Sequence, residues 1–175
     1  MSTDVKNMHM GQITSFFIPT VTLVGANCSS QIPDRLASLG AKKPLIVTDK
    51  GIVAVGILKQ ITDILDAAKL SYEVFDETVP NPTDKNVAAA TDAYTKGGCD
   101  SLITLGGGSS HDCGKGVGFV VSNGGKIHDY EGVDKSSKPF PPYVAVNTTA
   151  GTASEMTRFC IITDTSRKVK MAIVD

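Results

Sequence analysis

Near the middle of the chain, an apolar run passes directly into three glycines and then into small hydroxyl residues: Leu102-Ile103-Thr104-Leu105-Gly106-Gly107-Gly108-Ser109-Ser110. The run lacks the polar and apolar alternation of a half-exposed strand, which is typical of a strand buried on both faces of a parallel sheet. We expect a helix to follow over about residues 109–122. Glycines let the backbone approach a bulky ligand, and the free N–H groups of a helix N-terminus favour an anion. A phosphate-binding turn is therefore the favoured interpretation, and a tight turn that needs positive φ is the alternative.

The segments around this stretch repeat the order of strand, turn and helix. Apolar runs at 44–48, 71–75 and 143–147 predict strands, and apolar residues at helical spacing predict helices over about 57–68 and 83–94. Alternating strands and helices form a parallel sheet with helices on both faces and right-handed crossovers. The sequence therefore predicts an α/β fold with a doubly wound, mostly parallel, Rossmann-like sheet.

Both ends of the chain carry further strand signals. Short apolar runs at 13–18 and 21–24, joined at Pro19-Thr20, predict an N-terminal β-hairpin at a sheet edge, because proline cannot donate to a strand ladder. A second hairpin is predicted over 158–174, with its turn at Asp164-Thr165-Ser166-Arg167.

The composition is that of an ordinary globular domain. The chain has 175 residues, of which 41% are hydrophobic and 20% are charged, so that one sizeable core is feasible. We expect the polar residues 1–12 to form a flexible N-terminus and residues 13–175 to form a single dinucleotide-binding domain. Within it, residues 123–142 are rich in Gly, Asp, Lys, Ser and Pro and predict a long loop.

Several partners are disfavoured by the same composition. The 17 basic and 18 acidic residues form no long run of either sign, which argues against nucleic acid and against an anionic membrane. Four cysteines and three histidines are scattered without metal-ligand spacing, so neither a zinc site nor a disulfide framework is expected. The N-terminus has no signal-peptide core, and no apolar run is long enough to cross a membrane. A cytoplasmic location fits best.

The glycine turn differs from two common nucleotide-binding motifs. It is not a P-loop, because Gly116 follows Lys115 where a hydroxyl residue should stand. It also lacks the acidic residue that usually follows a Rossmann glycine motif by about 20 residues. Instead, Asp49 ends an earlier predicted strand, where a carboxylate can accept from ribose hydroxyls and would repel a 2′-phosphate. This favours NAD over NADP, and the alternative is that Asp49 caps the next helix.

Four motifs, in order and at fitting intervals, resemble those of the iron-containing (group III) alcohol dehydrogenases. They are GGGSSHDCGK at 106–115, DYEG at 129–132, NTTAGTASEMT at 147–157 and VKMAIVD at 169–175. The resemblance extends from about Phe16 to Asp175, and it is closest to the ethanol, methanol and 1,3-propanediol dehydrogenases. It implies an NAD-dependent oxidation of an alcohol to an aldehyde.

The resemblance also implies a set of cofactor-binding residues. It implies that Gly106, Gly107, Gly108 and Ser109 hold the pyrophosphate, that Asp49 faces the adenosine ribose and that Asn81 lies beside the cofactor. It further implies that Thr148 and Thr149 line the adenine and ribose side, that Thr152 and Ser154 occupy the neighbouring loop, and that Lys170 reaches the ribose of the cofactor.

Other polar residues near these motifs have structural interpretations. Asp112 and Lys115 are one helical turn apart, which predicts a salt bridge on a solvated face. His111 falls in the first turn of the predicted helix, where the dipole opposes protonation, so that packing or capping is favoured over a role as a base. His128 and Asp129 belong to the predicted loop and are weaker candidates for the border of a cleft.

The family resemblance implies a metal site that this chain does not encode. The family places one Asp and three His, which bind divalent iron or zinc, on an all-helical second domain that begins after the last strand. No catalytic or metal-binding residue is therefore predicted here, and we expect the chain alone to bind NAD weakly and to catalyse little. The implied partners are the missing helical domain and a small primary alcohol or aldehyde. Because the family's opening strand commonly pairs across a dimer, a homo-oligomer through residues 13–18 is also implied.

Two alternatives remain at this point. The chain could be a non-catalytic nucleotide-binding or regulatory fragment. It could also belong to a glycerol or dehydroquinate-type branch of the same superfamily, although the motif at 147–157 argues against that branch.

Overall fold

The computed structural model describes residues 20–175 of the chain. The elements, with η for 3-10 helices, are η2 (Cys28–Gln31), α1 (Ile32–Ser38), β1 (Pro44–Val47), α2 (Lys50–Ala54), α3 (Ile57–Ala67), β2 (Glu73–Phe75), α4 (Asp84–Lys96), β3 (Ser101–Gly106), α5 (Gly108–Asn123), η3 (Ile127–Tyr130), β4 (Gly132–Val133), β5 (Tyr143–Asn147), β6 (Phe159–Asp164) and β7 (Val169–Val174).

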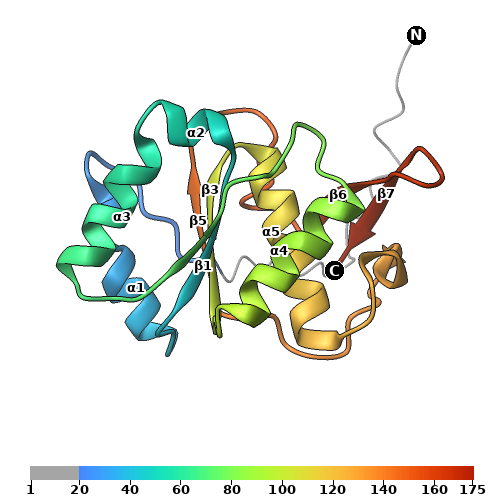
Figure 1. The fold of residues 1–175 in the computed structure, drawn as a ribbon, viewed down its shortest axis with the longest axis horizontal. Helices are drawn as coiled ribbons and strands as arrows, with labels where there is room; N and C mark the ends of the chain where they lie inside the picture. The colour runs from blue at the N-terminus through green and yellow to red at the C-terminus, as the bar shows by residue number, and fades with distance from the viewer. Residues whose placement is uncertain (1–19) are drawn as a thin grey trace, which may run out of the picture.

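The main sheet has four parallel strands in the order β2-β1-β3-β5 (Figure 1). The strand that follows β1 in the chain, β2, lies at one edge of the sheet, and the strand that follows β3 in the sheet, β5, lies at the opposite edge. The direction of winding therefore changes between β1 and β3. In open α/β sheets, ligands bind at this point, outside the carboxyl ends of the strands.

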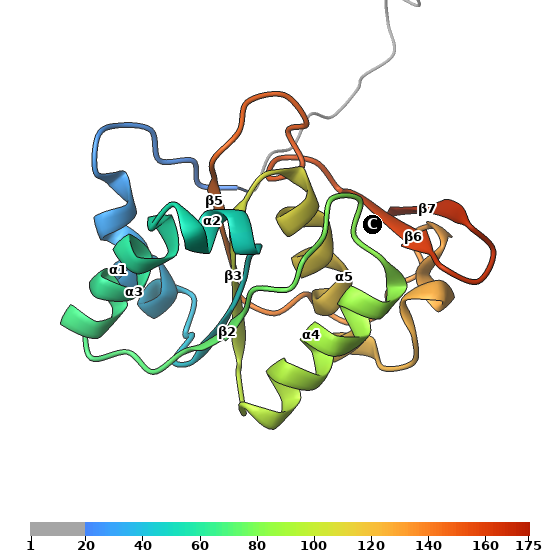
Figure 2. The same ribbon diagram turned by 45° about the horizontal axis from the view of Figure 1, so that its top comes forward.

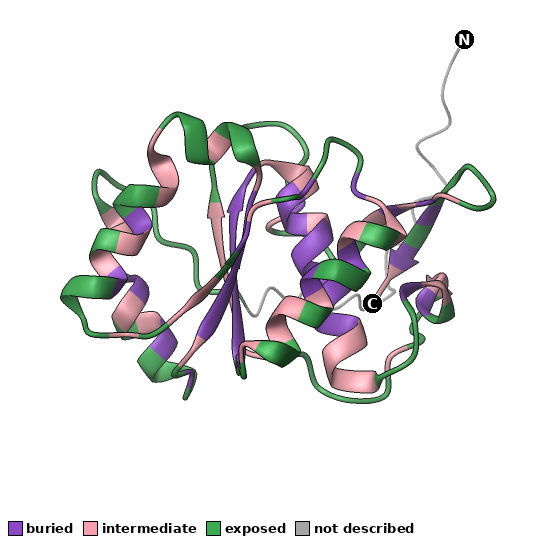
Figure 3. Cartoon of the chain, in the orientation of Figure 1, coloured by how far each residue is buried: buried purple, intermediate pink, exposed green. Residues whose placement is uncertain are grey.

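Helices cover both faces of the main sheet, which confirms the predicted doubly wound fold. Helices α1 and α3 lie on one face, and α4 and α5 lie on the other (Figures 1 and 3). Every residue of β1 and β3 is buried, as the uninterrupted apolar runs predicted. Alternate residues of each strand enter different cores: Ile46, Ile103 and Leu105 face α1 and α3, whereas Leu45, Val47 and Leu102 face α4 and α5.

A second, smaller sheet covers the outer side of α5. Its strand order is β4-β7-β6, and β6 pairs with β7 in the antiparallel hairpin that the sequence predicted. Cys160, Ile162, Met171 and Ile173 of this hairpin share a core with Val117 of α5. Helix α5 is thus enclosed between two sheets, and nine of its 16 residues are buried.

The start of α4 shows how local sequence sets an element boundary. The Thr83 side chain accepts a hydrogen bond from the backbone N–H of Asn86, and the Asn86 side chain accepts one from the backbone N–H of Thr83. This capping box satisfies two N–H groups that the helix itself cannot pair. It confirms the predicted helix start after the Asn81-Pro82 turn.

Two predicted features differ from the structure. Residues 21–24 form no strand, and Val21 and Val24 are 68% and 92% exposed. The reason is that a strand needs a ladder partner, and no strand within residues 20–175 pairs with this segment. The other half of the expected N-terminal hairpin, residues 13–18, lies outside the described residues, as do the dimer contact expected there and the N-terminus at 1–12.

The region 123–142 is the second difference, because it contains η3 and the short strand β4 instead of being irregular throughout. Strand β4 exists only through its pairing with β7, a partner about forty residues away in the chain that local composition does not reveal. No helix within residues 20–175 has both the length and the apolar content that are needed to cross a membrane.

Candidate dinucleotide site

The glycine turn lies at the carboxyl end of β3, where the winding of the sheet changes direction. Gly106 has φ +145°, and a Cβ at this position would lie 2.4 Å from the Ser110 Oγ, so that other residues would be strained. Gly107 precedes α5 and offers no side chain that could accept from the first N–H groups of the helix. Those N–H groups therefore lack a capping side chain and, with the positive end of the helix dipole, can bind an anion.

Asp49 has the capping role, one of the two that the sequence left open, and its contact with a ribose stays a prediction. It is the N-cap of α2, and its Oδ1 accepts from the backbone N–H of Ile52 at 3.0 Å. Its other carboxylate oxygen, Oδ2, lies 3.4 Å from the Ser110 Oγ in the first turn of α5. The carboxylate thus stands at the end of β1, next to the glycine turn, where Oδ2 accepts one long hydrogen bond from Ser110 and has a further lone pair.

Gly107 and Gly108 also make room for the loop that follows β5. A Cβ at Gly107 would lie 2.9 Å from Thr149 Oγ1, and one at Gly108 would lie 2.7 Å from Thr152 Oγ1. Thr148 joins the same region through its backbone N–H, which donates to the Gly106 carbonyl at 2.9 Å. The triple glycine therefore serves close packing of the threonine loop as well as access to the helix N-terminus.

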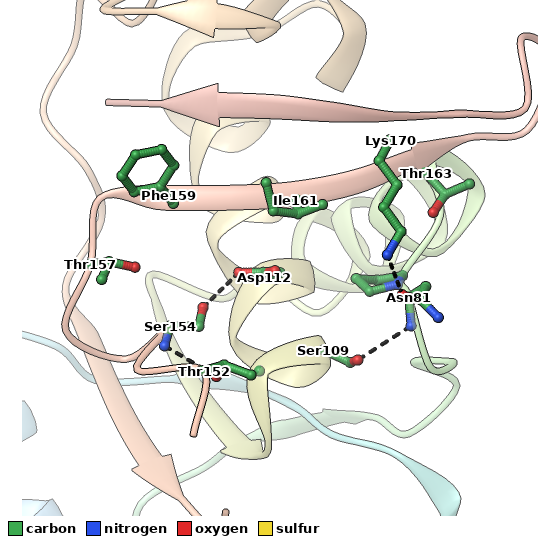
Figure 4. Close-up of a pocket in the computed structure, with 12 residues that line it drawn as sticks. Asn81, Ser109, Asp112, Thr152, Ser154, Thr157, Phe159, Ile161, Thr163 and Lys170 are labelled. Atoms are coloured by element: carbon green, nitrogen blue, oxygen red, sulfur yellow. Dashed lines mark hydrogen bonds between the residues drawn. The ribbon is translucent and has the colours of Figure 1, made fainter. Parts of the chain in front are cut away.

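A pocket of about 340 Å³ opens beside the N-terminus of α5 (Figure 4). Six predicted residues line this pocket: Asn81, Gly108, Ser109, Thr152, Ser154 and Lys170. Asn81 connects two of them, because its Oδ1 accepts from Lys170 Nζ at 2.8 Å and its backbone N–H donates to the Ser109 Oγ at 3.3 Å.

The other five predicted residues do not line the pocket: Asp49, Gly106, Gly107, Thr148 and Thr149. They lie at or just beyond the carboxyl ends of β1, β3 and β5. The predicted set therefore divides into a strand-end group and a pocket group, which meet at the first residues of α5.

The structure corrects the interpretation of Asp112 and Lys115. Lys115 Nζ lies 3.5 Å from Asp112 Oδ1, as the spacing predicted. However, the Lys115 side chain is only 11% exposed and the Asp112 side chain only 15%. The pair is buried because the β6–β7 hairpin covers this side of α5.

Asp112 is a pocket residue that the sequence analysis missed, and its Oδ1 accepts from the Ser154 Oγ at 2.6 Å (Figure 4). The available signal was the run of small and apolar residues at 116–121, since a helix that carries no polar face is typical of a buried one.

Comparison with known proteins gives the same family as the motifs. The sequence pattern described as iron-containing alcohol dehydrogenase matches residues 19–175. The chain belongs to this family. It is 48% identical, over 93% of its length, to alcohol dehydrogenase 4 of Schizosaccharomyces pombe and 42% identical, again over 93%, to the NAD-dependent methanol dehydrogenase of Bacillus methanolicus.

The structural comparison agrees with the sequence comparison. The fold matches the crystal structure of a 1,3-propanediol oxidoreductase with a TM-score of 0.90 and 42% identity, over 94% of this chain and 43% of that chain. The two curated relatives are covered over only 39% and 43% of their own lengths. The chain therefore spans about two fifths of the length of the relatives that it matches.

His111 has the packing role that was expected. It is fully buried, with Nδ1 at 2.8 Å from Thr104 Oγ1 and Nε2 at 3.2 Å from Asn147 Oδ1. Burial lowers its pKa, although the hydrogen bond with Asn147 opposes this effect. Asn147 in turn donates to the Thr149 carbonyl, so His111 supports the start of the threonine loop.

His128 does not line the pocket, and neither does Asp129, whose carboxylate accepts from the Lys126 N–H at 2.7 Å. Instead, His128 Nε2 lies 3.6 Å from Asp84 Oδ2 and 3.4 Å from Asp164 Oδ2. Possible ligand atoms of these three residues lie within 4.8 Å of one another, which makes them a candidate for a metal site.

The surroundings of this cluster do not fit the iron that the family name implies. Asp164 Oδ2 accepts from Arg167 Nε at 2.5 Å, and Oδ1 accepts from Ser166 and from the Arg167 backbone. These bonds hold the pKa of Asp164 well below its usual range. An ion would have to compete with the guanidinium for the same carboxylate, so we interpret the cluster as an ion-pair network.

Proposed function

We propose that this chain binds NAD at the carboxyl ends of β1, β3 and β5 and forms the cofactor domain of an NAD-dependent alcohol dehydrogenase. The observation that carries the proposal is the convergence of Asp49, the glycine turn and the pocket at the point where the winding of the sheet changes direction. That point is the general ligand-binding position of doubly wound sheets. The name of the Bacillus methanolicus relative, which includes NAD dependence, supports the same cofactor.

The division of the site into two groups suggests how a dinucleotide would lie. Its diphosphate would occupy the N-terminus of α5, where the N–H groups of the first turn lack side-chain acceptors. The adenosine ribose would face Oδ2 of Asp49 at the end of β1. The second nucleotide half would enter the pocket, whose volume of about 340 Å³ is within the range of small-molecule sites.

The proposed reaction is hydride transfer between NAD and a small primary alcohol or aldehyde. NAD accepts the hydride when it is bound, and this chain would bind and orient it. Activation of the alcohol oxygen is a separate task, and the Asp84, His128 and Asp164 cluster does not fit it. We propose that an additional helical domain provides the metal ligands, so that the chain alone binds NAD but does not oxidise alcohols.

Asp49 provides the test of cofactor choice. We expect Asp49→Asn and Asp49→Gly to raise the affinity for NADP relative to NAD by about tenfold, because each removes a carboxylate that would repel the 2′-phosphate. Both changes keep the helix start, since the Asn side chain can still accept from Ile52 and Gly is tolerated at an N-cap. Isothermal titration calorimetry of each variant with NAD and NADP measures the ratio.

An unchanged ratio in both variants would show that Asp49 only caps α2. Absence of NAD binding by the unmodified chain, at millimolar ligand, would overturn the proposed function itself.

A further inference from the structure

Lys115 is the only buried lysine within residues 20–175. It is not one of the proposed cofactor-binding residues. Its Nζ donates to three backbone carbonyls: that of Ser154 at 2.8 Å, that of Thr157 at 3.3 Å and that of Phe159. An ammonium group has three N–H donors and no acceptor, so these contacts use its complete capacity. Asp112, at 3.5 Å, supplies the opposite charge.

Two of the three carbonyls, those of Ser154 and Thr157, belong to a segment without regular structure, and the third belongs to Phe159, the first residue of β6. Residues 148–158, between β5 and β6, form neither helix nor strand, and they pass over the N-terminal end of α5 (Figure 2). A segment outside a sheet has no neighbouring strand whose N–H groups could donate to its carbonyls. A carbonyl that is shielded from water and lacks a donor lowers the stability of the fold. Lys115 therefore replaces the missing backbone partners at the distal end of this segment.

The segment that Lys115 holds is one wall of the pocket. Ser154, Thr157 and Phe159 line the pocket, whereas Lys115 does not (Figure 4). The beginning of the segment is held independently, because Thr148 donates to Gly106 and the Asn147 side chain donates to Thr149. Lys115 thus contacts the pocket wall at Ser154, Thr157 and Phe159, whereas other contacts hold the beginning of the segment.

We propose that Lys115 is a positioning residue of the dinucleotide site, which holds residues 154–159 where they form the pocket wall for the second nucleotide half of NAD. This inference rests on the proposed function. It requires that loss of the ammonium group weakens the binding of the complete dinucleotide more than the binding of its adenosine diphosphate half, which contacts the α5 N-terminus and Asp49.

The test compares NAD and ADP binding to the 175-residue chain by isothermal titration calorimetry. We expect Lys115→Met to weaken NAD binding by at least about tenfold and ADP binding by less than about threefold. Lys115→Arg, which keeps a cation with several donors, should recover part of the NAD affinity. Lys96→Met is the matched control, because Lys96 is an exposed lysine that pairs with Asp92 on α4 and lies outside the pocket, and it should change neither affinity.

Amide hydrogen exchange gives a second measurement that does not depend on a ligand. In Lys115→Met, the amides of residues 150–159 should exchange faster, while those of the buried strand β3 should remain as protected as in the unmodified chain. Equal weakening of NAD and ADP, unchanged NAD affinity, or faster exchange throughout β3 would each overturn the positioning role. If the unmodified chain binds ADP but not NAD, the proposed function fails, and this inference fails with it.

Discussion

Replacing Gly107 with valine should reduce NAD affinity by more than about a hundredfold, because the side chain would force the glycine turn and the threonine loop apart. A Cβ at this position would already lie 2.9 Å from Thr149 Oγ1 and 3.3 Å from Thr149 Cγ2, and valine adds two methyl groups beyond it. Either the threonine loop or the turn must move, and the turn carries the N–H groups proposed to bind the diphosphate. The backbone of Gly107 has φ −92°, which other residues adopt, so we expect the fold to survive.

A graded series separates this steric effect from unfolding. Gly107→Ala adds only the Cβ, which meets the far end of a side chain that can rotate, so its NAD affinity should fall by only about threefold to tenfold. Calorimetric titration with NAD gives the affinities, and circular dichroism at 222 nm checks the fold. If Gly107→Val binds NAD as tightly as the unmodified chain, the diphosphate does not lie on this turn.

The largest expected effect on stability is at Gly114, where α5 packs against β3. A Cβ at Gly114 would lie 2.1 Å from Thr104 Cγ2. Thr104 is fully buried and cannot rotate freely, because its Oγ1 is 2.8 Å from both His111 Nδ1 and the Tyr143 hydroxyl. We therefore expect Gly114→Ala to lower the free energy of unfolding by about 3 kcal/mol, from overpacking and from strained buried hydrogen bonds. For a chain of this length, that corresponds to a fall in the melting temperature of roughly 10 °C.

The control for this prediction removes the methyl group that clashes. Thr104→Ser keeps the hydroxyl that contacts His111 and Tyr143 but lacks Cγ2, so the double variant should recover at least about half of the lost free energy. Gly118→Ala is a useful contrast: its Cβ would approach Phe140 to 1.9 Å, but Phe140 is 37% exposed and can move. Urea denaturation measures all four variants, and a double variant as unstable as Gly114→Ala would show that Thr104 is not the cause.

Much of the parallel sheet could be predicted from the chain alone, because its signals are local. A strand that is buried on both faces is apolar at nearly every position, and β3 could therefore be predicted at residues 101–105. The start of α4 is equally local, since Thr83 and Asn86 pair their side chains with backbone groups only three residues away. The glycine turn could be predicted because its signal is also local: Gly106 adopts a positive φ that other residues avoid.

The candidate site was predicted in part. Asp49 was left with two possible roles. The structure shows the helix cap through Oδ1 and a hydrogen bond from Ser110 to Oδ2 beside the glycine turn, and the ribose contact stays a prediction. Residues 21–24 are not a strand as predicted, because apolar residues alone do not make a strand and none of the strands within residues 20–175 pairs with them.

Only the tertiary structure decided the surroundings of Asp112 and Lys115. Their spacing of three residues determined that the two side chains meet, because neighbours on a helix face are set by the helical repeat. Whether that face meets water or protein depended on a hairpin about fifty residues later in the chain, which packs on α5 and buries the pair. The sequence by itself thus determined the buried strands of the parallel sheet, the glycine turn and the i, i+3 pair, since these follow from backbone geometry over a few residues. The packing of the second sheet onto α5, which converts a surface salt bridge into the support of a pocket wall, was decided by contacts between surfaces distant in sequence.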